Sequence, residues 1–168
     1  DSMLPGSDLP HVYPATAALE GRVPIGYRVV IIGGGGIGVE IASFLARRGQ
    51  LNSEVLEFLG DYKALSDNDR EIIDRKGHDV TLVSRQRRLG GSVGGSTRWV
   101  LSKEVVNAGV RVLTNYVAKE ITVEGVVVEH KNEETLIPAD TVFLATGLRP
   151  NTALYDSLSA ARVAPRIE

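Results

Sequence analysis

The chain has 168 residues, of which 43% are hydrophobic and 24% charged, and it carries a formal net charge of −2. This length suits one compact domain, and so small a net charge gives no reason to expect nucleic acid or a membrane surface as a partner. Because the chain has no cysteine and only three scattered histidines, we expect in it no disulfide, no thiolate nucleophile, no metal site and no iron–sulfur cluster.

No apolar run approaches the roughly 20 residues that span a bilayer, and no charged-then-apolar leader opens the chain. We therefore expect a cytoplasmic protein. The first residue is Asp1 rather than methionine, which suggests a segment of a longer polypeptide. Residues 1–26 contain four prolines and three glycines, a composition that predicts an extended arm or linker.

A strand, a glycine turn and a helix are predicted next along the chain. Residues 27–32 form a β-branched run typical of a buried strand, four glycines follow at 33–36, and apolar residues recur at helical spacing over 37–46. Residues 50–77 then form an insertion whose pattern predicts two solvent-facing helical segments, with Ser66 or Asp67 as the cap of the second.

Strands dominate the rest of the chain. The predicted elements are a strand at 79–84, a helix at 99–107, a strand at 110–117 and a strand at 141–145. Between the last two, alternating stretches at 120–129 and 134–138, with Gly125 and Asn132 as turn signals, predict a small antiparallel meander. Residues 155–168 fit no predicted element. The alternation of strands and helices predicts an α/β fold: a Rossmann-like parallel sheet with a small antiparallel β-meander.

The glycines after the first long strand have the spacing G-x-G-x-x-G, at Gly33, Gly35 and Gly38. In such a turn the first glycine permits the sharp bend, the second lets the backbone approach a pyrophosphate, and the third lets the helix pack closely. The amides of the first helical turn carry partial positive charge, so a diphosphate could bind there. Since the required strand and helix flank the motif, we interpret it as a dinucleotide site rather than a turn without a ligand.

The end of the second long strand predicts which dinucleotide would bind. A carboxylate that holds the adenosine ribose would be expected there, but the strand ends at Ser84 and is followed by Arg85, Arg87 and Arg88. Guanidinium groups bind a 2′-phosphate, whereas a carboxylate repels it. The pattern therefore favours NADP(H) over NAD(H); a solvated basic loop without a ligand is the alternative.

A second glycine-rich stretch lies in the same basic part of the chain. Gly90, Gly91, Gly94 and Gly95 would either close over the cofactor or simply be flexible. Trp99, the only tryptophan, is expected to pack in the core beneath this loop.

Three parts of the chain resemble the NAD(P)H-binding domain of two-dinucleotide flavoprotein reductases, the glutathione-reductase type. They are the strand–glycine–helix segment at 27–40, the segment Ala145-Thr146-Gly147-Leu148-Arg149-Pro150-Asn151, which is similar to the A-T-G-x-R-P-N exit segment of that superfamily, and the entry linker at 4–12. Within the superfamily, the insertion at 50–77, Arg85 and the stretch 94–99 resemble the 2,4-dienoyl-CoA reductases and related NADH:flavin oxidoreductases of the old yellow enzyme type.

The resemblance implies a role for each candidate residue. The pyrophosphate would lie against Gly33, Gly34, Gly35, Gly36, Ile37 and Gly38, the 2′-phosphate against Ser84, Arg85, Arg87 and Arg88, the nicotinamide near Glu40, and the flavin half near Thr146 and Gly147. No catalytic side chain is implied, because the flavin carries the chemistry.

The resemblance also predicts the organisation of a parent enzyme. Residues 1–26 would lead in from an FAD-binding half, 27–151 would be the NAD(P)H-binding domain, and 152–168 would lead back to that half. In such enzymes hydride passes from NAD(P)H to FAD, and electrons then reach an iron–sulfur cluster and FMN, where an enoate or 2,4-dienoyl-CoA substrate is reduced. The FAD half, the FMN barrel and the cluster would lie outside this chain, which would not turn over alone.

Two other functions stay open at this point. The chain could be the NAD(P)H domain of another flavoprotein, such as an NADH oxidase or a ferredoxin reductase, or a non-catalytic module that senses NAD(P)H for a partner. A methyltransferase also uses a glycine turn after its first strand, but the ending Ala145-Thr146-Gly147 argues against it.

Overall fold

A computed structural model of the chain describes residues 4–48, 58–62, 64, 77–91, 94–147 and 151–161. Five parallel strands form the central sheet in the order β1-β8-β2-β3-β4. Their bounds are Val12–Pro14 for β1, Thr141–Leu144 for β8, Arg28–Ile32 for β2, Asp79–Ser84 for β3 and Arg111–Thr114 for β4. A second, antiparallel sheet consists of β5 (Val117–Thr122), β6 (Gly125–His130) and β7 (Glu133–Pro138). The predicted fold class is confirmed.

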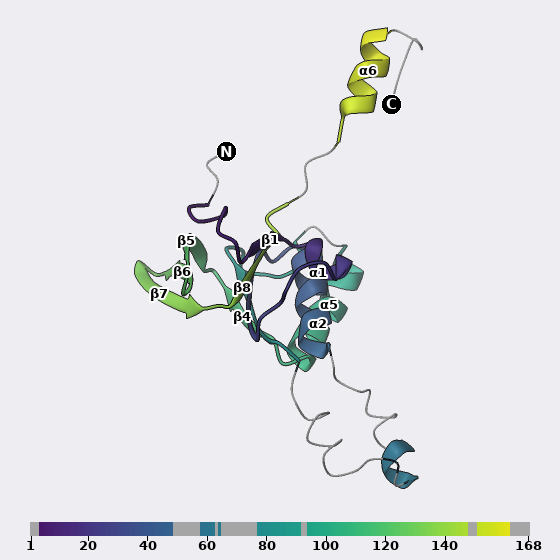
Figure 1. The fold of residues 1–168 in the computed structure, drawn as a ribbon, viewed down its shortest axis with the longest axis vertical. Coiled ribbons are helices and arrows are strands. Elements are labelled where there is room, and N and C mark those ends of the chain that lie inside the picture. Colours follow the sequence, from purple (N-terminus) through teal and green to yellow (C-terminus); the bar gives the residue numbers. More distant parts are fainter. Residues whose placement is uncertain are drawn as a thin grey trace.

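The central sheet lies between a layer of helices and the antiparallel meander (Figure 1). The helices are α1 (Ala17–Glu20), α2 (Gly36–Arg47) and α5 (Gly95–Asn107). Val29 and Ile31 of β2 pack on the helix side, and Val30 and Ile32 pack on the meander side. Because successive side chains of a strand point to opposite faces, a strand covered on both faces must be apolar throughout, as β2 is.

The chain order places the carboxyl ends of three strands together. β2 leads through α2 to β3, and β3 leads through α5 to β4, while β8 and β1 lie on the other side of β2. Ile32 is opposite both Val83 of β3 and Leu144 of β8, so these strands end at the same level. The strand order thus reverses between β2 and β8, at the edge where the glycine turn begins.

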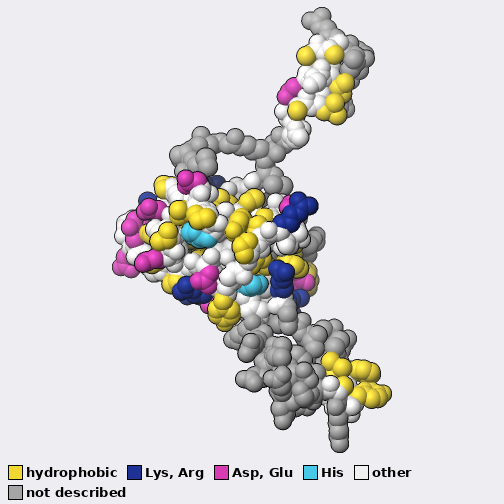
Figure 2. Space-filling view, in the orientation of Figure 1, with side chains coloured by type: hydrophobic (Ala, Val, Ile, Leu, Met, Phe, Trp, Pro, Cys, Tyr) yellow, Lys and Arg dark blue, Asp and Glu magenta, His cyan; other side chains and the backbone are white. Residues whose placement is uncertain are grey.

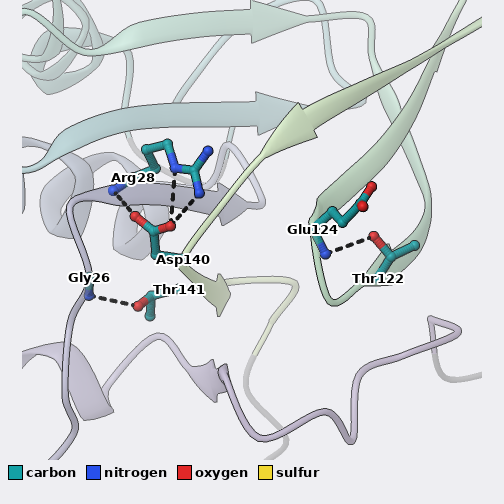
Figure 3. Close-up of polar contacts among 6 residues, drawn as sticks. All are labelled: Gly26, Arg28, Thr122, Glu124, Asp140 and Thr141. Carbon is teal, nitrogen blue, oxygen red and sulfur yellow. Dashed lines mark hydrogen bonds and ion pairs between the residues drawn. The ribbon is translucent and has the colours of Figure 1, made fainter.

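The amino ends of β2 and β8 are joined by side chains (Figure 3). The Asp140 carboxylate accepts hydrogen bonds from the Arg28 backbone N–H at 2.8 Å and from its guanidinium Nε at 3.0 Å. The bond from the Arg28 side chain holds the pKa of Asp140 below its usual range. Beside this pair, the Gly26 N–H donates to Thr141 Oγ1 at 2.9 Å.

The outer surface of the meander is acidic. Its exposed or half-buried glutamates are Glu120, Glu124, Glu129, Glu133 and Glu134, and Figure 2 shows acidic side chains gathered on this side of the molecule. The opposite face carries Ile121, Val126, Val128 and Ile137, which are buried against the central sheet. This division is the one expected of an antiparallel sheet that has one face in water.

Two sequence predictions for secondary structure are wrong. Residues 1–26 are not only an arm, because Val12–Pro14 pairs with β8 as an edge strand, a position at which proline is tolerated. The single strand predicted at 110–117 is two strands, because Asn115 adopts a left-handed φ of 62° that turns the chain from β4 into the meander.

Three helical regions also differ from the predictions or extend them. The helix predicted at 99–107 begins at Gly95. Residues 153–161, part of which had no predicted element, form α6 (Ala153–Ala161), whose residues are all exposed and which lies away from both sheets in Figure 1. Most of the insertion at 50–77 lies outside the described residues; within it, 58–61 are helical.

Two further findings concern only the residues that the structure describes. None of their helices is long and apolar enough to cross a bilayer. Nor do three or more His, Asp or Glu side chains come together among them in a way that could hold a metal ion.

Candidate functional site

A crevice of about 430 Å³ opens at the carboxyl ends of the central strands. It lies where the strand order reverses between β2 and β8, the usual position of ligand sites in open parallel sheets. Its walls come from the loops after β2, β3 and β8 and from the chain that enters β5. The lining residues are Leu4, Ile32, Gly33, Gly34, Gly35, Val83, Ser84, Arg85, Gln86, Tyr116, Val117, Ala118, Ala145, Thr146 and Gly147.

The floor of the crevice is a backbone turn in which only glycine fits. Gly33 has a φ of +126°, and a Cβ atom there would overlap the carbonyl oxygen of Ala145. The Gly33 N–H donates to the Val83 carbonyl at 2.8 Å, which holds the turn against the end of β3. A Cβ at Gly34 would overlap the Ser84 hydroxyl, and one at Gly38 would overlap the Gly33 carbonyl. The turn, β3, β8 and α2 are therefore in close backbone contact.

Helix α2 begins at the crevice without a capping side chain. Its N-cap is Gly35, with extended backbone, and the first helical hydrogen bond runs from the Val39 N–H to the Gly35 carbonyl at 3.1 Å. The N-terminus of a helix carries partial positive charge, and the glycines keep side chains away from it. This geometry suits an anion such as a pyrophosphate.

The loop after β3 forms the next wall. Ser84 is buried, and its hydroxyl accepts a hydrogen bond from the Gln86 N–H at 3.2 Å, which bends the chain so that Arg85 and Gln86 line the crevice. The Gly90 N–H donates to the Gly34 carbonyl at 2.7 Å. At Gly90, therefore, the second glycine-rich stretch is bonded to the first glycine turn.

The predicted site residues do not all come together. Gly33, Gly34, Gly35, Ser84, Arg85, Thr146 and Gly147 line the crevice, whereas Gly36, Ile37, Gly38, Glu40, Arg87 and Arg88 do not. Glu40 is exposed on α2. Arg87 and Arg88 line a different hollow, which is described below.

The prediction that Trp99 packs in the core is wrong, since 65% of its surface is exposed. Leu101 and Val105 are the α5 residues that pack against the core. Trp99 lies two residues before Leu101, about 200° around the helix, and so points outward.

Tyr116, Val117 and Ala118 form a wall that sequence reasoning missed. The Tyr116 ring stacks on His130 of β6 with centroids 4.4 Å apart, and His130 Nδ1 lies 3.0 Å from the Asn115 carbonyl. The signal was available, because loops after neighbouring parallel strands meet at one edge. This wall was missed because 110–117 was assigned to one strand, which places Tyr116 and Val117 inside the strand and not in the segment that follows it.

Comparison with known proteins agrees with this geometry. A family model described as pyridine nucleotide-disulphide oxidoreductase matches residues 7–165. The chain belongs to this family. Its members are flavin-dependent oxidoreductases that use pyridine nucleotides.

Three similar proteins illustrate the family. A metal reductase of Desulforamulus reducens is 34% identical over 148 residues, which cover 88% of this chain and 22% of the relative. The structure of a 2-naphthoyl-CoA reductase in complex with 2-naphthoyl-CoA matches 94% of this chain and 20% of that chain, with a TM-score of 0.72 and 21% identity. An engineered water-forming NADPH oxidase bound to NADPH matches 98% of this chain and 31% of that chain, with a TM-score of 0.59 and 22% identity. This chain spans about a fifth of the length of the curated relatives it matches.

Proposed function

We propose that the crevice binds NADP(H) and that the chain is the NADP(H)-binding part of a flavin-dependent oxidoreductase. The observation that carries this proposal is the turn Gly33–Gly35 at the start of α2, which opens into a crevice at the point where the strand order reverses. Backbone amides at such a turn hold a pyrophosphate. Membership of a pyridine nucleotide family supports the same ligand.

The preference for NADP(H) rests on Arg85. This residue lines the crevice, and the strand before it ends in a buried serine rather than a carboxylate. A guanidinium group there would pair with the 2′-phosphate of the adenosine. The engineered NADPH oxidase offers a parallel, since its substitutions replace an aspartate and introduce two arginines.

The chain's own residues would bind and orient the dinucleotide. Gly33–Gly35 would hold the pyrophosphate, Tyr116–Ala118 would give the adenine an apolar wall, and Thr146 and Gly147 would border the nicotinamide half. When bound, NADPH supplies a hydride. No acid or base from this chain is required, because the acceptor would be a flavin held by another part of the polypeptide.

We further propose that the electrons finally reduce an enoate or 2,4-dienoyl-CoA type of substrate, which the sequence resemblance favours. A metal ion as final acceptor is the second candidate, and the 34% identical metal reductase favours it. Both candidates use this chain in the same way, so its own ligand can be tested first.

Calorimetric titration of the chain with NADPH and, in parallel, with NADH tests the proposal. We expect one site that binds NADPH more tightly than NADH, because only NADPH offers a phosphate to Arg85. Equal affinity would contradict the NADP preference and leave the crevice assignment standing. Absence of binding by both nucleotides would contradict the function itself.

A further inference from the structure

A second hollow, which we call the basic groove, lies between the loop after β3, helix α5 and strand β4. It has a volume of about 410 Å³, and its lining includes Arg87, Arg88, Trp99, Val106 and Val112. None of its lining residues lines the crevice. The basic groove is therefore a separate place, to which the proposed dinucleotide function assigns nothing.

The groove combines a flat aromatic surface with an apolar floor. Trp99 and Val106 are 65% and 66% exposed, although both are large apolar side chains on one helix. The lining also includes Leu89, which belongs to the core, and Val112, which packs against it. An indole left in water beside an apolar floor is the kind of surface on which a planar ring stacks.

The charge of the groove is one-sided. Arg87 and Arg88 are exposed on the loop after β3, and Arg98 of α5 also contributes to the lining. Residues 85–103, which include this loop and the first turns of α5, contain five basic residues and no acidic one. Guanidinium groups pair with phosphate through two parallel hydrogen bonds, so the groove is suited to a phosphorylated ligand.

We propose that the basic groove binds a nucleoside phosphate, with its base stacked on Trp99 and its phosphate paired with Arg87 and Arg88. The volume lies within the range of small-molecule sites. An acidic peptide is the less favoured occupant, because the groove places one ring platform next to one cluster of arginines, an arrangement that matches a single base and its phosphate. The proposal is independent of what binds in the crevice.

Titration of the chain with ADP, followed by tryptophan fluorescence, tests this proposal directly. Trp99 is the only tryptophan, so all tryptophan emission comes from a residue of the groove. We expect saturable quenching by ADP and little quenching by inorganic phosphate, which has no ring to stack. In the double variant Arg87→Ala, Arg88→Ala, the ADP concentration that gives half-maximal quenching should rise roughly tenfold or more, because charged hydrogen bonds to the phosphate are lost. The matched control, Arg85→Ala, should leave it unchanged.

Three results would overturn the proposal. The first is no quenching at about 10 mM ADP, where even a site of millimolar affinity would be occupied. The second is quenching that Arg85→Ala removes and the double variant does not. The third is Trp99 emission that changes with protein concentration in the absence of ADP, which would make the groove a protein interface. Calorimetric titration of the double variant with NADPH, in which the groove is impaired and every crevice residue is kept, reports on the crevice. The two proposals can therefore fail independently.

Discussion

Strands β2 and β8 lie side by side, yet their two ends are held in different ways. At the amino ends, side chains join them: Asp140 of the turn before β8 binds Arg28, and Thr141 binds Gly26. At the carboxyl ends, the contacts are made by backbone, with Gly33 packed against the Ala145 carbonyl. Bulky side chains at the second end would fill the crevice. The side-chain bonds between the two strands and the crevice that we propose binds NADP(H) are thus at opposite ends of the same pair of strands.

The largest effect is expected from Gly33→Ala at the carboxyl end. The new Cβ would meet the Ala145 carbonyl at a φ of +126°, so we expect a loss of roughly 2–5 kcal/mol in the free energy of unfolding, together with loss of NADPH binding. Urea unfolding and calorimetry measure the two quantities.

Gly21→Ala is the matched control for this change. Gly21 also has a positive φ, of 66°, but no atom lies within 4 Å of its added Cβ. It should lose only about 1 kcal/mol from backbone strain and keep its affinity for NADPH. If Gly33→Ala were as mild as this control, the close contact at the crevice floor would not matter.

The next largest effect is expected from Arg85→Ala. NADPH binding should weaken by roughly 1.5–3 kcal/mol as charged hydrogen bonds are lost, whereas NADH binding should change little. Arg87→Ala is the control, because Arg87 does not line the crevice. Equal losses for NADPH and NADH, or a loss caused by Arg87→Ala, would show that Arg85 does not select the 2′-phosphate.

Two histidines, one near each end of β2 and β8, allow the same substitution to be compared at the two ends. His130→Ala removes the ring on which Tyr116 stacks, so nucleotide binding should weaken by roughly 0.5–1.5 kcal/mol. His78 Nδ1 lies 2.8 Å from the Gly26 carbonyl at the amino end. His78→Ala should therefore lower the unfolding free energy and leave the affinity unchanged. If His78→Ala also weakened the affinity for NADPH, the amino ends of the strands would take part in binding and the comparison would be wrong.

The smallest effect is expected from Asp140→Asn, which should lower the free energy of unfolding by only about 0.5 kcal/mol because the pair is partly exposed. The folded-state pKa of Asp140 is lowered, chiefly by the side-chain bond from Arg28. The Asp140 carboxylate therefore contributes fully to the free energy of unfolding above the pKa of an unfolded aspartate, about 3.9. This contribution is lost as the pH falls through the lower pKa that Asp140 has in the folded state. Unfolding at a series of pH values should show that the free energies of unfolding of the unaltered chain and of Asp140→Asn converge below about pH 4. A constant difference would mean that the carboxylate charge plays no part.

Most of the parallel sheet could be predicted from the sequence. β3 has the predicted bounds, Asp79–Ser84, and β2 differs by one residue, because strands buried on both faces are continuous apolar runs between polar ends. The glycine turn could also be predicted, since its spacing is local. The split at Asn115 could not, because distant residues hold the turn there: the Tyr116 N–H donates to the Ser84 carbonyl, and His130 Nδ1 lies 3.0 Å from the Asn115 carbonyl.

The sequence by itself determined that a strand, a tight glycine turn and a helix follow one another, because those features depend on neighbouring residues alone. Only the tertiary structure decided which side chains reach the crevice. Arg85 and Arg87 are two residues apart, yet one lines the crevice and the other the basic groove. The Ser84–Gln86 turn is local, but the bond from Gly90 to Gly34 joins the loop to the end of β2 and sets its path only in the folded chain.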